Sequence, residues 1–281
     1  MPRRRRCRAA SVALFCTLAS LVTFSSTSHA EVDVVGGTPT KYARWKGVVN
    51  MYVDGPGCTV VLLSPTVGLT AHHCAENFIS EPMRIAIVGG SDLTEESTVV
   101  PHATVQSIAL FPQASNANWF NQDIALLRLQ SPVTTAPYYA IDRSHSRRIS
   151  TVGTIVGYGS TAFGIADHGV AREGRITIAN PFPGDPNNAY SLYFTGPSAA
   201  CHGDSGAPLF FERQQEWWVT AIVSGGENCD PDQFGYATRL APRWSWLNAT
   251  HRSWTGEDLP RTGGMASPAP WRIMFPMLSA L

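Results

Sequence analysis

Short runs of β-branched and aromatic residues recur along this chain, and clusters of glycine, proline, asparagine and aspartate separate them. Runs of this length between turn-forming residues are typical of β-strands rather than helices. The pattern predicts strands at 47–53, 59–63, 84–88, 104–110, 124–129, 154–157, 173–178, 207–211 and 217–223. Many short strands at this spacing indicate an all-β domain, built as a barrel or a sandwich.

The first 30 residues follow a different pattern. Five arginines lie at positions 3–6 and 8, an apolar stretch covers 9–24, and Ser28, His29 and Ala30 offer small residues for cleavage. This order is typical of a secretory signal peptide at 1–30, cleaved after Ala30. The alternative is a short membrane anchor, but the apolar stretch is shorter than a typical span, so we expect no membrane span in the mature chain.

The C-terminal segment 253–281 is poor in periodic apolar positions and rich in Gly and Pro, which predicts an irregular tail. Within it, the sequence Leu-Pro-Arg-Thr-Gly at 259–263 resembles the sortase recognition pattern, which would imply attachment to a cell wall. The segment that follows is short, is broken by prolines and carries Arg272. We therefore favour an exposed tail and keep anchoring as the alternative.

Composition and charge narrow the classes of function. With 281 residues, 44% of them hydrophobic and 15% charged, the chain fits one ordinary domain or two small ones. The whole chain balances 21 basic against 21 acidic residues, and loss of the five arginines before residue 31 leaves 16 basic residues. A mature chain with excess negative charge argues against nucleic acid or an anionic membrane as the main partner.

Two stretches carry the chemistry: Thr-Ala-His-His-Cys at 70–74 and Cys-His-Gly-Asp-Ser-Gly-Ala-Pro at 201–208. A serine hydroxyl attacks an acyl carbon only where a base takes its proton and donors stabilise the oxyanion. The small residues around Ser205 allow a sharp turn, in which the backbone N–H groups of Gly203 and Ser205 converge on one oxygen. Glycine at 203 permits that backbone geometry.

These stretches resemble the base and nucleophile motifs of the trypsin and chymotrypsin family of serine proteases. Asp-Ile-Ala-Leu-Leu-Arg-Leu at 123–129 and Val-Val-Gly-Gly at 34–37 are similar to two further family signatures, in the family's order. The resemblance implies the catalytic residues His73, Asp123 and Ser205. The chain departs from the family at Ala207, where a second glycine is usual, and at His72, where alanine is usual, so the base is the histidine directly before the cysteine.

The resemblance also implies the architecture: two packed six-stranded antiparallel β-barrels with a C-terminal helix at 240–250. His73 and Asp123 would lie on the first barrel and Ser205 on the second, with the connection through 131–150, where prolines and polar residues interrupt the strand pattern. The protease domain would cover 34–252 and the irregular tail 253–281.

Cysteine usage agrees with secretion. Two of the six cysteines, Cys7 and Cys16, leave with the signal peptide, and four in a secreted chain indicate two disulfides with three open pairings. The family resemblance implies the pairs Cys58–Cys74 and Cys201–Cys229. A metal site at His72, His73 and Cys74 is the alternative, but adjacent residues do not readily direct three ligands at one ion, so we expect no metal and no cofactor.

The resemblance assigns activation to Val34 and Asp204. In the family, a newly formed N-terminal ammonium pairs with this aspartate and orders the pocket. Cleavage after Ala30 would leave 31–33 as a short propeptide, and Asp33 stands where family zymogens have a basic residue. Either a protease of another specificity trims the chain, or the enzyme works with the longer terminus.

The family resemblance places Ala199, Ser224, Gly226 and Gly235 around the substrate pocket. Trypsin-like specificity requires a buried aspartate at position 199, and without it a Lys or Arg side chain would enter unpaired. Two glycines leave the pocket open, so we predict cleavage after aromatic or large aliphatic residues. Gly225 replaces a family tryptophan, which changes the surface against which an extended substrate pairs.

Together these features predict a secreted, monomeric serine endopeptidase that acts on proteins or peptides through an acyl-enzyme. The alternative is a noncatalytic binding protein on the same fold. An esterase or lipase would need a Gly-x-Ser-x-Gly elbow and alternating helices, and 203–207 departs from that motif. The Arg-rich, Lys-poor composition favours a bacterial source.

Overall fold

The structure of the chain is a computed structural model. It describes residues 34–112, 119–144, 146, 148–184 and 186–260. The predicted signal peptide, the 31–33 segment and all but the first two residues of the sortase-like pattern lie outside the described residues. The strands are β1 (Thr38–Pro39), β2 (Val48–Tyr52), β3 (Thr59–Ser64), β4 (Val67–Thr70), β5 (Ala86–Gly89), β6 (Val100–Leu110), β7 (Ala125–Leu129), β8 (Val152–Gly157), β9 (Arg172–Ala179), β10 (Ser191–Thr195), β11 (Pro208–Arg213), β12 (Glu216–Gly226) and β13 (Gly235–Arg239).

Helices are few and short among the described residues. The α-helices are α1 (His72–Ala75) and α2 (Trp244–Thr255), and 3-10 turns lie at Tyr42–Arg44, Glu76–Phe78, Pro82–Arg84, Glu96–Thr98, Trp119–Asn121, Pro186–Ala189 and Ala241–Arg243. None of the described helices is long and apolar enough to cross a membrane.

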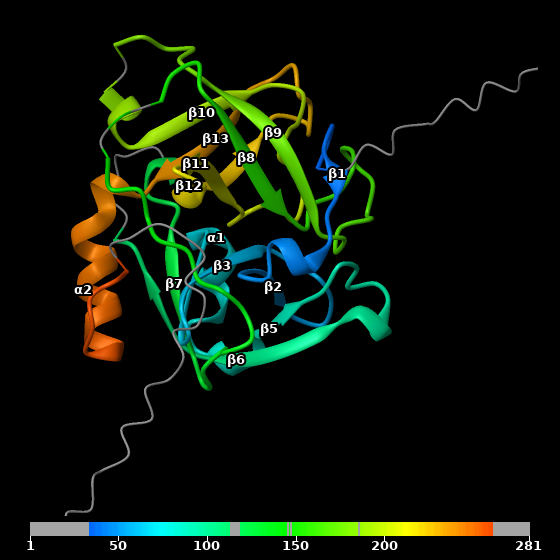
Figure 1. Cartoon of the computed structure of the whole chain (residues 1–281), viewed down its shortest axis with the longest axis vertical. Coiled ribbons are helices and arrows are strands. Elements are labelled where there is room, and N and C mark those ends of the chain that lie inside the picture. The colour runs from blue at the N-terminus through cyan, green and yellow to red at the C-terminus, as the bar shows by residue number, and fades with distance from the viewer. Residues whose placement is uncertain (1–33, 113–118, 145, 147, 185, 261–281) are drawn as a thin grey trace, which may run out of the picture. The chain divides into compact units, whose positions relative to one another are not determined.

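Six antiparallel strands close the first barrel in the order β2-β3-β4-β7-β6-β5 (Figure 1). Alternate residues of β3, such as Val60 and Leu62, point into the barrel interior, while Val61 and Leu63 pack into a second core outside it. Because β3 is buried on both faces, its sequence is a continuous apolar run with no alternation.

The second barrel consists of β8, β9, β10, β13, β12 and β11, and it closes because β8 pairs with both β9 and β11. The short β1 adds to the edge of β9. Ile155, Ile176 and Leu209 are fully buried in its interior. The expected two-barrel fold is therefore confirmed, and the connection between the barrels runs from the end of β7 at Leu129 to the start of β8 at Val152.

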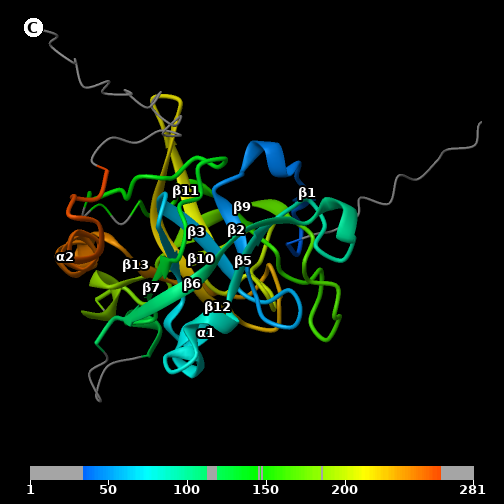
Figure 2. The same cartoon turned by 90° about the horizontal axis from the view of Figure 1, so that it is seen from below.

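The core outside the first barrel, which contains Val61 and Leu63, also joins the barrels to α2. Phe210 of β11 is fully buried, stacks on Trp45 at 4.9 Å between ring centroids, and shares its cluster with Leu126 of β7 and Leu247 of α2. In both views α2 lies beside β7 (Figures 1 and 2). This shared core holds together the two barrels that carry the candidate catalytic residues.

The sequence pattern did not predict four of the strands in the described residues. The strands β1, β4, β10 and β13 contain two to five residues each and have no clear alternation of apolar and polar positions. The expected strand start at 84 was wrong, because Pro82 begins a 3-10 turn that includes Arg84, and β5 starts at Ala86. Proline favours the first position of a helical turn, since its φ is preset and it has no N–H to satisfy.

The C-terminal helix was expected at 240–250, with an irregular tail from 253. Instead α2 continues to Thr255 and ends where Gly256 adopts φ +80°, so the prediction for 253–255 was wrong. A left-handed glycine ends a helix by turning its N–H back onto the last turn, and here Gly256 N–H donates to Arg252 O at 2.8 Å. Beyond this cap, Leu259 is 2% exposed and its N–H donates to Asn248 Oδ1 at 2.8 Å.

We therefore expect Leu259→Ala to destabilise the domain, although sequence analysis placed this residue in the tail. Removing a buried leucine side chain costs about 2–5 kcal/mol, because the transfer free energy is lost and a cavity remains. Chemical denaturation of the variant would measure the change. Ile149→Ala is the control, because Ile149 is 40% exposed and its truncation should change stability by less than about 0.5 kcal/mol. Equal effects at both sites would place Leu259 outside the folded domain.

Candidate active site

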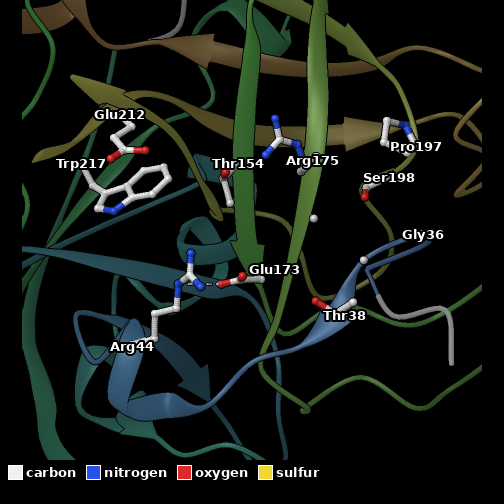
Figure 3. A pocket seen from close by; sticks show the side chains of 12 residues that line it. Gly36, Thr38, Arg44, Thr154, Glu173, Arg175, Pro197, Ser198, Glu212 and Trp217 are labelled. Atoms are coloured by element: carbon white, nitrogen blue, oxygen red, sulfur yellow. Dashed lines mark ion pairs between the residues drawn. The ribbon is translucent and has the colours of Figure 1, made fainter. Parts of the chain in front are cut away.

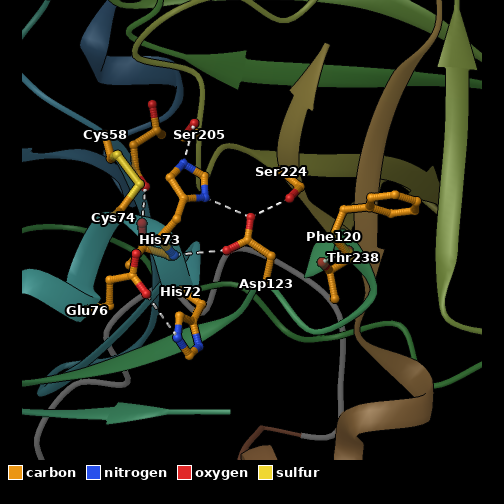
Figure 4. A network of polar contacts seen from close by, with 12 residues as sticks. Cys58, His72, His73, Cys74, Glu76, Phe120, Asp123, Ser205, Ser224 and Thr238 are labelled. Atoms are coloured by element: carbon orange, nitrogen blue, oxygen red, sulfur yellow. Dashed lines mark hydrogen bonds and ion pairs between the residues drawn. A yellow bond between two sulfur atoms is a disulfide. The ribbon is translucent and has the colours of Figure 1, made fainter. Parts of the chain in front are cut away.

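His73 lies on α1, directly after β4 and Ala71 (Figure 4). Its backbone N–H donates to Asp123 Oδ1 at 2.9 Å, and its Nδ1 lies 2.8 Å from Asp123 Oδ2. A disulfide between Cys58 and Cys74 ties α1 to the segment before β3. Asp123 thus holds both the backbone and the imidazole of His73, and the disulfide holds the helix that carries them.

Asp123 stands between the 3-10 turn Trp119–Asn121 and β7, and its side chain is 1% exposed. Besides the two contacts with His73, its Oδ2 accepts a hydrogen bond from the Ser224 hydroxyl of β12. Three donors from two barrels therefore converge on this carboxylate. The family resemblance implied a place for Ser224 in the substrate pocket, and no sequence signal links Ser224 to a residue about 100 positions earlier, so this contact was not predicted.

Ser205 comes from the second barrel, in the loop that precedes β11. Its Oγ lies 2.9 Å from His73 Nε2, so the hydroxyl and Asp123 contact opposite nitrogens of one imidazole. The backbone of the first barrel positions this loop, since Thr59 N–H donates to Ser205 O at 2.8 Å. The three residues that the sequence assigned to catalysis therefore form one hydrogen-bonded line across the two barrels.

The expected oxyanion donors are the backbone N–H groups of Gly203 and Ser205. Gly203 has φ +99°, and a Cβ there would lie 3.0 Å from Tyr158 O, so this left-handed turn favours glycine. Among the described residues, no acceptor takes a hydrogen bond from the backbone N–H of Gly203 or Ser205. Both N–H groups are thus available to bind a negatively charged oxygen.

Asp204 lies between Gly203 and Ser205 in the sequence, and its side chain is completely buried. Its Oδ1 accepts from Gly159 N–H at 2.9 Å and its Oδ2 from Cys201 N–H at 3.0 Å. Burial raises the pKa of Asp204 to about 7, although both hydrogen bonds and the charge of Arg172 act to lower it. Val34, its expected partner in activation, is fully buried in the core of the same barrel.

His72 has a different environment from its neighbour. It is 8% exposed, its Nε2 lies 3.5 Å from Glu76 Oε2, and its Nδ1 has no hydrogen-bond partner among the described residues. Figure 4 shows its ring turned away from Ser205. Of the two adjacent histidines, it is therefore His73 that contacts Asp123 and Ser205.

Opposing effects act on His73. Burial lowers its pKa, whereas the hydrogen bond and the charge of Asp123, together with the charge of Glu76, raise it, and the raising effects prevail. A histidine in this setting can act as a general base once it is neutral, and its raised pKa means that it becomes neutral at a higher pH than a free histidine.

A pocket of about 210 Å³ opens beside Ser205. It is lined by Phe163, Ala200, Cys201, His202, Ser205, Ser224, Gly225, Gly226, Asn228, Cys229 and Tyr236. Of the expected pocket residues, Ser224 and Gly226 are in this lining and Ala199 and Gly235 are not. Ala199 is buried and donates its N–H to Val35 O, and Gly235 faces the Phe194 ring, which a Cβ at 235 would approach to 2.2 Å.

Two aromatic residues of this pocket were missed by the sequence analysis. The Tyr236 hydroxyl would lie 2.9 Å from a Cβ at Gly225, so the tyrosine packs directly over the glycine. Phe163 is 62% exposed at the pocket mouth, with its ring 5.9 Å from that of His202. Tyr236 reaches Gly225 only because β12 and β13 pair in this register, which no single-sequence signal reveals.

The four cysteines form the disulfides Cys58–Cys74 and Cys201–Cys229, the pairs that the resemblance implied. The second bridge borders the pocket. Ligand atoms of Cys58, His73 and Cys74 lie within 4.8 Å of one another. However, the two sulfur atoms are bonded to each other, and a disulfide sulfur is not the thiolate that binds zinc.

A larger cavity, of about 460 Å³, lies away from these residues, between the segment 36–38 and the outer surface of the second barrel (Figure 3). Its polar wall includes an ion pair between Arg44 and Glu173, whose Nε and Oε2 lie 3.2 Å apart. None of the residues that line it belongs to the expected catalytic set. The size of a cavity alone therefore does not identify a catalytic site.

A comparison with protein-family models finds a match to the model described as Trypsin over residues 34–247. The matched region begins at Val34, includes both barrels and ends within α2.

Proposed function

Because the chain belongs to the trypsin family, we propose that it is a secreted serine endopeptidase whose catalytic residues are Ser205, His73 and Asp123. The family supports a hydrolase that acts on proteins. The single observation that carries the finer assignment is the line of hydrogen bonds from Asp123 through His73 to Ser205, next to two backbone N–H groups that have no acceptor among the described residues. A binding protein has no need of this arrangement.

In the proposed mechanism, Ser205 Oγ attacks the peptide carbonyl carbon while His73 Nε2 takes its proton. The carbonyl oxygen becomes an oxyanion that accepts hydrogen bonds from Gly203 and Ser205 N–H. His73 then gives the proton to the leaving amine, which breaks the C–N bond and leaves an acyl-enzyme. Water, deprotonated by the same imidazole, releases the acid. Asp123 keeps the proton of the neutral imidazole on Nδ1 and stabilises the imidazolium.

The decisive test is covalent labelling by a fluorophosphonate, which reacts with activated serines, followed by intact-mass measurement. One adduct per chain supports a catalytic Ser205. Absence of any adduct from folded protein that begins at Val34 would favour the noncatalytic binding protein instead. The same mass spectrum reports where the secreted chain begins and ends.

The lining of the pocket supports cleavage after aromatic or large aliphatic residues. Among the described residues that line it, none is acidic, and Ala200, Gly226 and Tyr236 form apolar wall. A buried ammonium without a counter-charge is strongly disfavoured. We expect kcat/KM for a peptide with Phe before the scissile bond to exceed that for the same peptide with Lys by about 100-fold, which corresponds to about 3 kcal/mol. Faster cleavage after Lys would contradict the proposed specificity.

The pH dependence of kcat/KM should report the ionisation of His73. The imidazole must be neutral to accept the proton of Ser205, so kcat/KM rises with pH through the pKa of His73. Because the charge of Glu76 helps to raise that pKa, Glu76→Gln should move the acid limb of the profile to lower pH. The profile of kcat/KM would be measured for both proteins, with Glu81→Gln as the control, because Glu81 is an exposed carboxylate that pairs with Arg84 and does not act on the pKa of His73. An unchanged acid limb would show that Glu76 does not act on the base.

Secretion and activation are part of the proposal. Two disulfides are consistent with an extracellular protein, and the signal peptide at 1–30 and cell-wall anchoring through the tail stay as predictions. We propose Val34 and Asp204 as the residues of an activation step, in which a new N-terminal ammonium at Val34 adds positive charge near the buried carboxylate.

A further inference from the structure

The chain folds back onto α2 directly after this helix ends. Gly256 turns the backbone, and residues 257–260 then make hydrogen bonds to side chains of the helix that they have just left. The carbonyl of Glu257 accepts a hydrogen bond from His251 Nδ1 at 2.9 Å, and in Figure 1 this segment lies, in red, beside α2. We call residues 257–260 the clasp. The clasp belongs to the folded domain.

Asn248 of α2 is the residue that holds the clasp at its centre. Its Oδ1 accepts the backbone N–H of Leu259 at 2.8 Å, and its Nδ2 donates to Asp258 Oδ1 at 2.9 Å. Arg252, four residues further along the helix, also donates to Asp258 Oδ1, at 3.1 Å. Because one amide uses both its acceptor and its donor on two successive residues, it fixes the direction of the clasp as well as its position.

The side chain of Leu259 adds an apolar contact to these hydrogen bonds. It is 2% exposed and belongs to the same apolar core as Leu126 of β7 and Leu247 of α2. Burial of a leucine side chain is sufficient to reduce the open fraction of such a segment by about 10-fold to 100-fold. The leucine is therefore accessible to another molecule only during local opening of the clasp.

Leu259 and Pro260 are also the first two residues of the sortase-like pattern at 259–263. An enzyme that recognises Leu-Pro-x-Thr-Gly must contact the leucine side chain, and the folded protein keeps this side chain in its core. A side chain that is packed inside one protein cannot at the same time enter the pocket of a second. The pattern is thus present in the sequence, but its first residue is part of the fold.

We propose that the clasp controls sortase attachment of this protein: a sortase acts on the pattern at 259–263 only when residues 257–260 separate from α2. The reaction is an acyl transfer. The sortase thiol forms a thioester with the Thr262 carbonyl, the Thr262–Gly263 amide breaks, and the thiol proton passes to the Gly263 amine. An acceptor amine then displaces the thiol and forms a new amide. This inference does not depend on the chemistry of Ser205, so it is tested separately from the proposed protease function.

The test uses the chain from Glu31 to Leu281 with Ser205→Ala in every protein, which prevents proteolysis during the assay. The probes are a soluble sortase that accepts Leu-Pro-x-Thr-Gly and triglycine as the acceptor amine. Intact mass measures the exchange of residues 263–281 for triglycine. A synthetic peptide of residues 257–267 gives the rate for the same pattern without the fold. Circular dichroism and the thermal midpoint show whether each protein is folded at the assay temperature.

Asn248→Ala opens the clasp without changing the pattern. It removes both hydrogen bonds of this side chain to the clasp, and alanine is the most favourable residue within a helix, so α2 is retained. Asp258→Ala is a second variant, which removes the acceptor of Asn248 Nδ2 and leaves the backbone N–H of Leu259 on Asn248 Oδ1. Ser253→Ala is the matched control, because its exposed hydroxyl donates to Thr250 O within the helix.

We expect the folded protein with an intact clasp to react at least about 30-fold more slowly than the peptide, because only its open fraction is a substrate. Asn248→Ala should raise the rate about 10-fold, since two hydrogen bonds that hold the closed form are lost. Asp258→Ala should raise it by less. Ser253→Ala should leave the rate within about 2-fold of the protein with an intact clasp.

Three outcomes would overturn the inference. Attachment of the folded protein with an intact clasp at a rate within about 3-fold of the peptide would show that the clasp does not hide the pattern. Equal, slow rates with and without Asn248→Ala would show that something other than the clasp blocks attachment, and if that variant does not fold, Asp258→Ala decides in its place. A peptide that does not react would show that 259–263 is not a sortase substrate.

Discussion

Replacement of Ser205 by alanine is expected to lower kcat for peptide hydrolysis by about 10⁶-fold, as loss of the nucleophile does in a protease with the same triad on another fold. The physical reason is that the oxygen atom that attacks the carbonyl is removed, while the pocket and the N–H groups of Gly203 and Ser205 remain. The residual rate would come from binding and oxyanion stabilisation alone. Steady-state hydrolysis and fluorophosphonate labelling both measure the effect.

The matched control is Ser198→Ala. The Ser198 hydroxyl is buried and has no hydrogen-bond partner among the described residues, and it lines the larger cavity of Figure 3 rather than the pocket beside Ser205. Its loss should leave kcat and labelling within about 2-fold of wild type, since surface or unpaired groups away from the site contribute little. Hydrolysis that survives Ser205→Ala at the wild-type rate would assign the activity to another group or to a contaminant.

Asp123→Asn should have the second largest effect, a decrease in kcat of about 10⁴-fold, the value for the equivalent change in the family's best-studied triad. The carboxylate accepts hydrogen bonds from the backbone N–H and Nδ1 of His73 and from the Ser224 hydroxyl. An amide can instead turn its NH₂ group towards Nδ1. That arrangement favours the imidazole tautomer with its proton on Nε2, which cannot accept the proton of Ser205.

Asp142→Asn is the control for this prediction. Asp142 is buried like Asp123, with 2% exposure, and accepts hydrogen bonds from Arg148 and from Ser144 N–H, but it belongs to the connection between the barrels. The hydrogen bond and the positive charge of Arg148, together with the hydrogen bonds from Ser144, lower the pKa of Asp142 despite its burial. We expect the variant to be less stable but to keep its kcat per folded molecule. A similar loss of kcat in both variants would mean that Asp123 acts through stability, not through the imidazole.

The sequence alone predicted the features that depend on residues close together in the chain. The run at 59–63 identified β3 because its residues are apolar on both faces, and the motifs at 70–74 and 201–208 identified His73 and Ser205 because their chemistry depends on adjacent residues. Strands with two to five residues and no clear alternation, such as β10 and β13, were missed because pairing with neighbours, not local pattern, makes them strands. The helix boundary at Gly256 was missed for a similar reason, since Leu259 is buried only once the chain folds back.

The amino-acid sequence by itself thus determined the family, the all-β class, the identity of the three candidate catalytic residues and the four cysteines that bond. Only the tertiary structure decided the contacts between distant segments: Ser224 on Asp123, Tyr236 over Gly225, and the backbone of Gly159 on the buried carboxylate of Asp204. The physical reason is that hydrogen bonds and charges act over a few ångströms in space. Strand pairing and barrel packing bring these residues together, and no pattern along the chain encodes those distances.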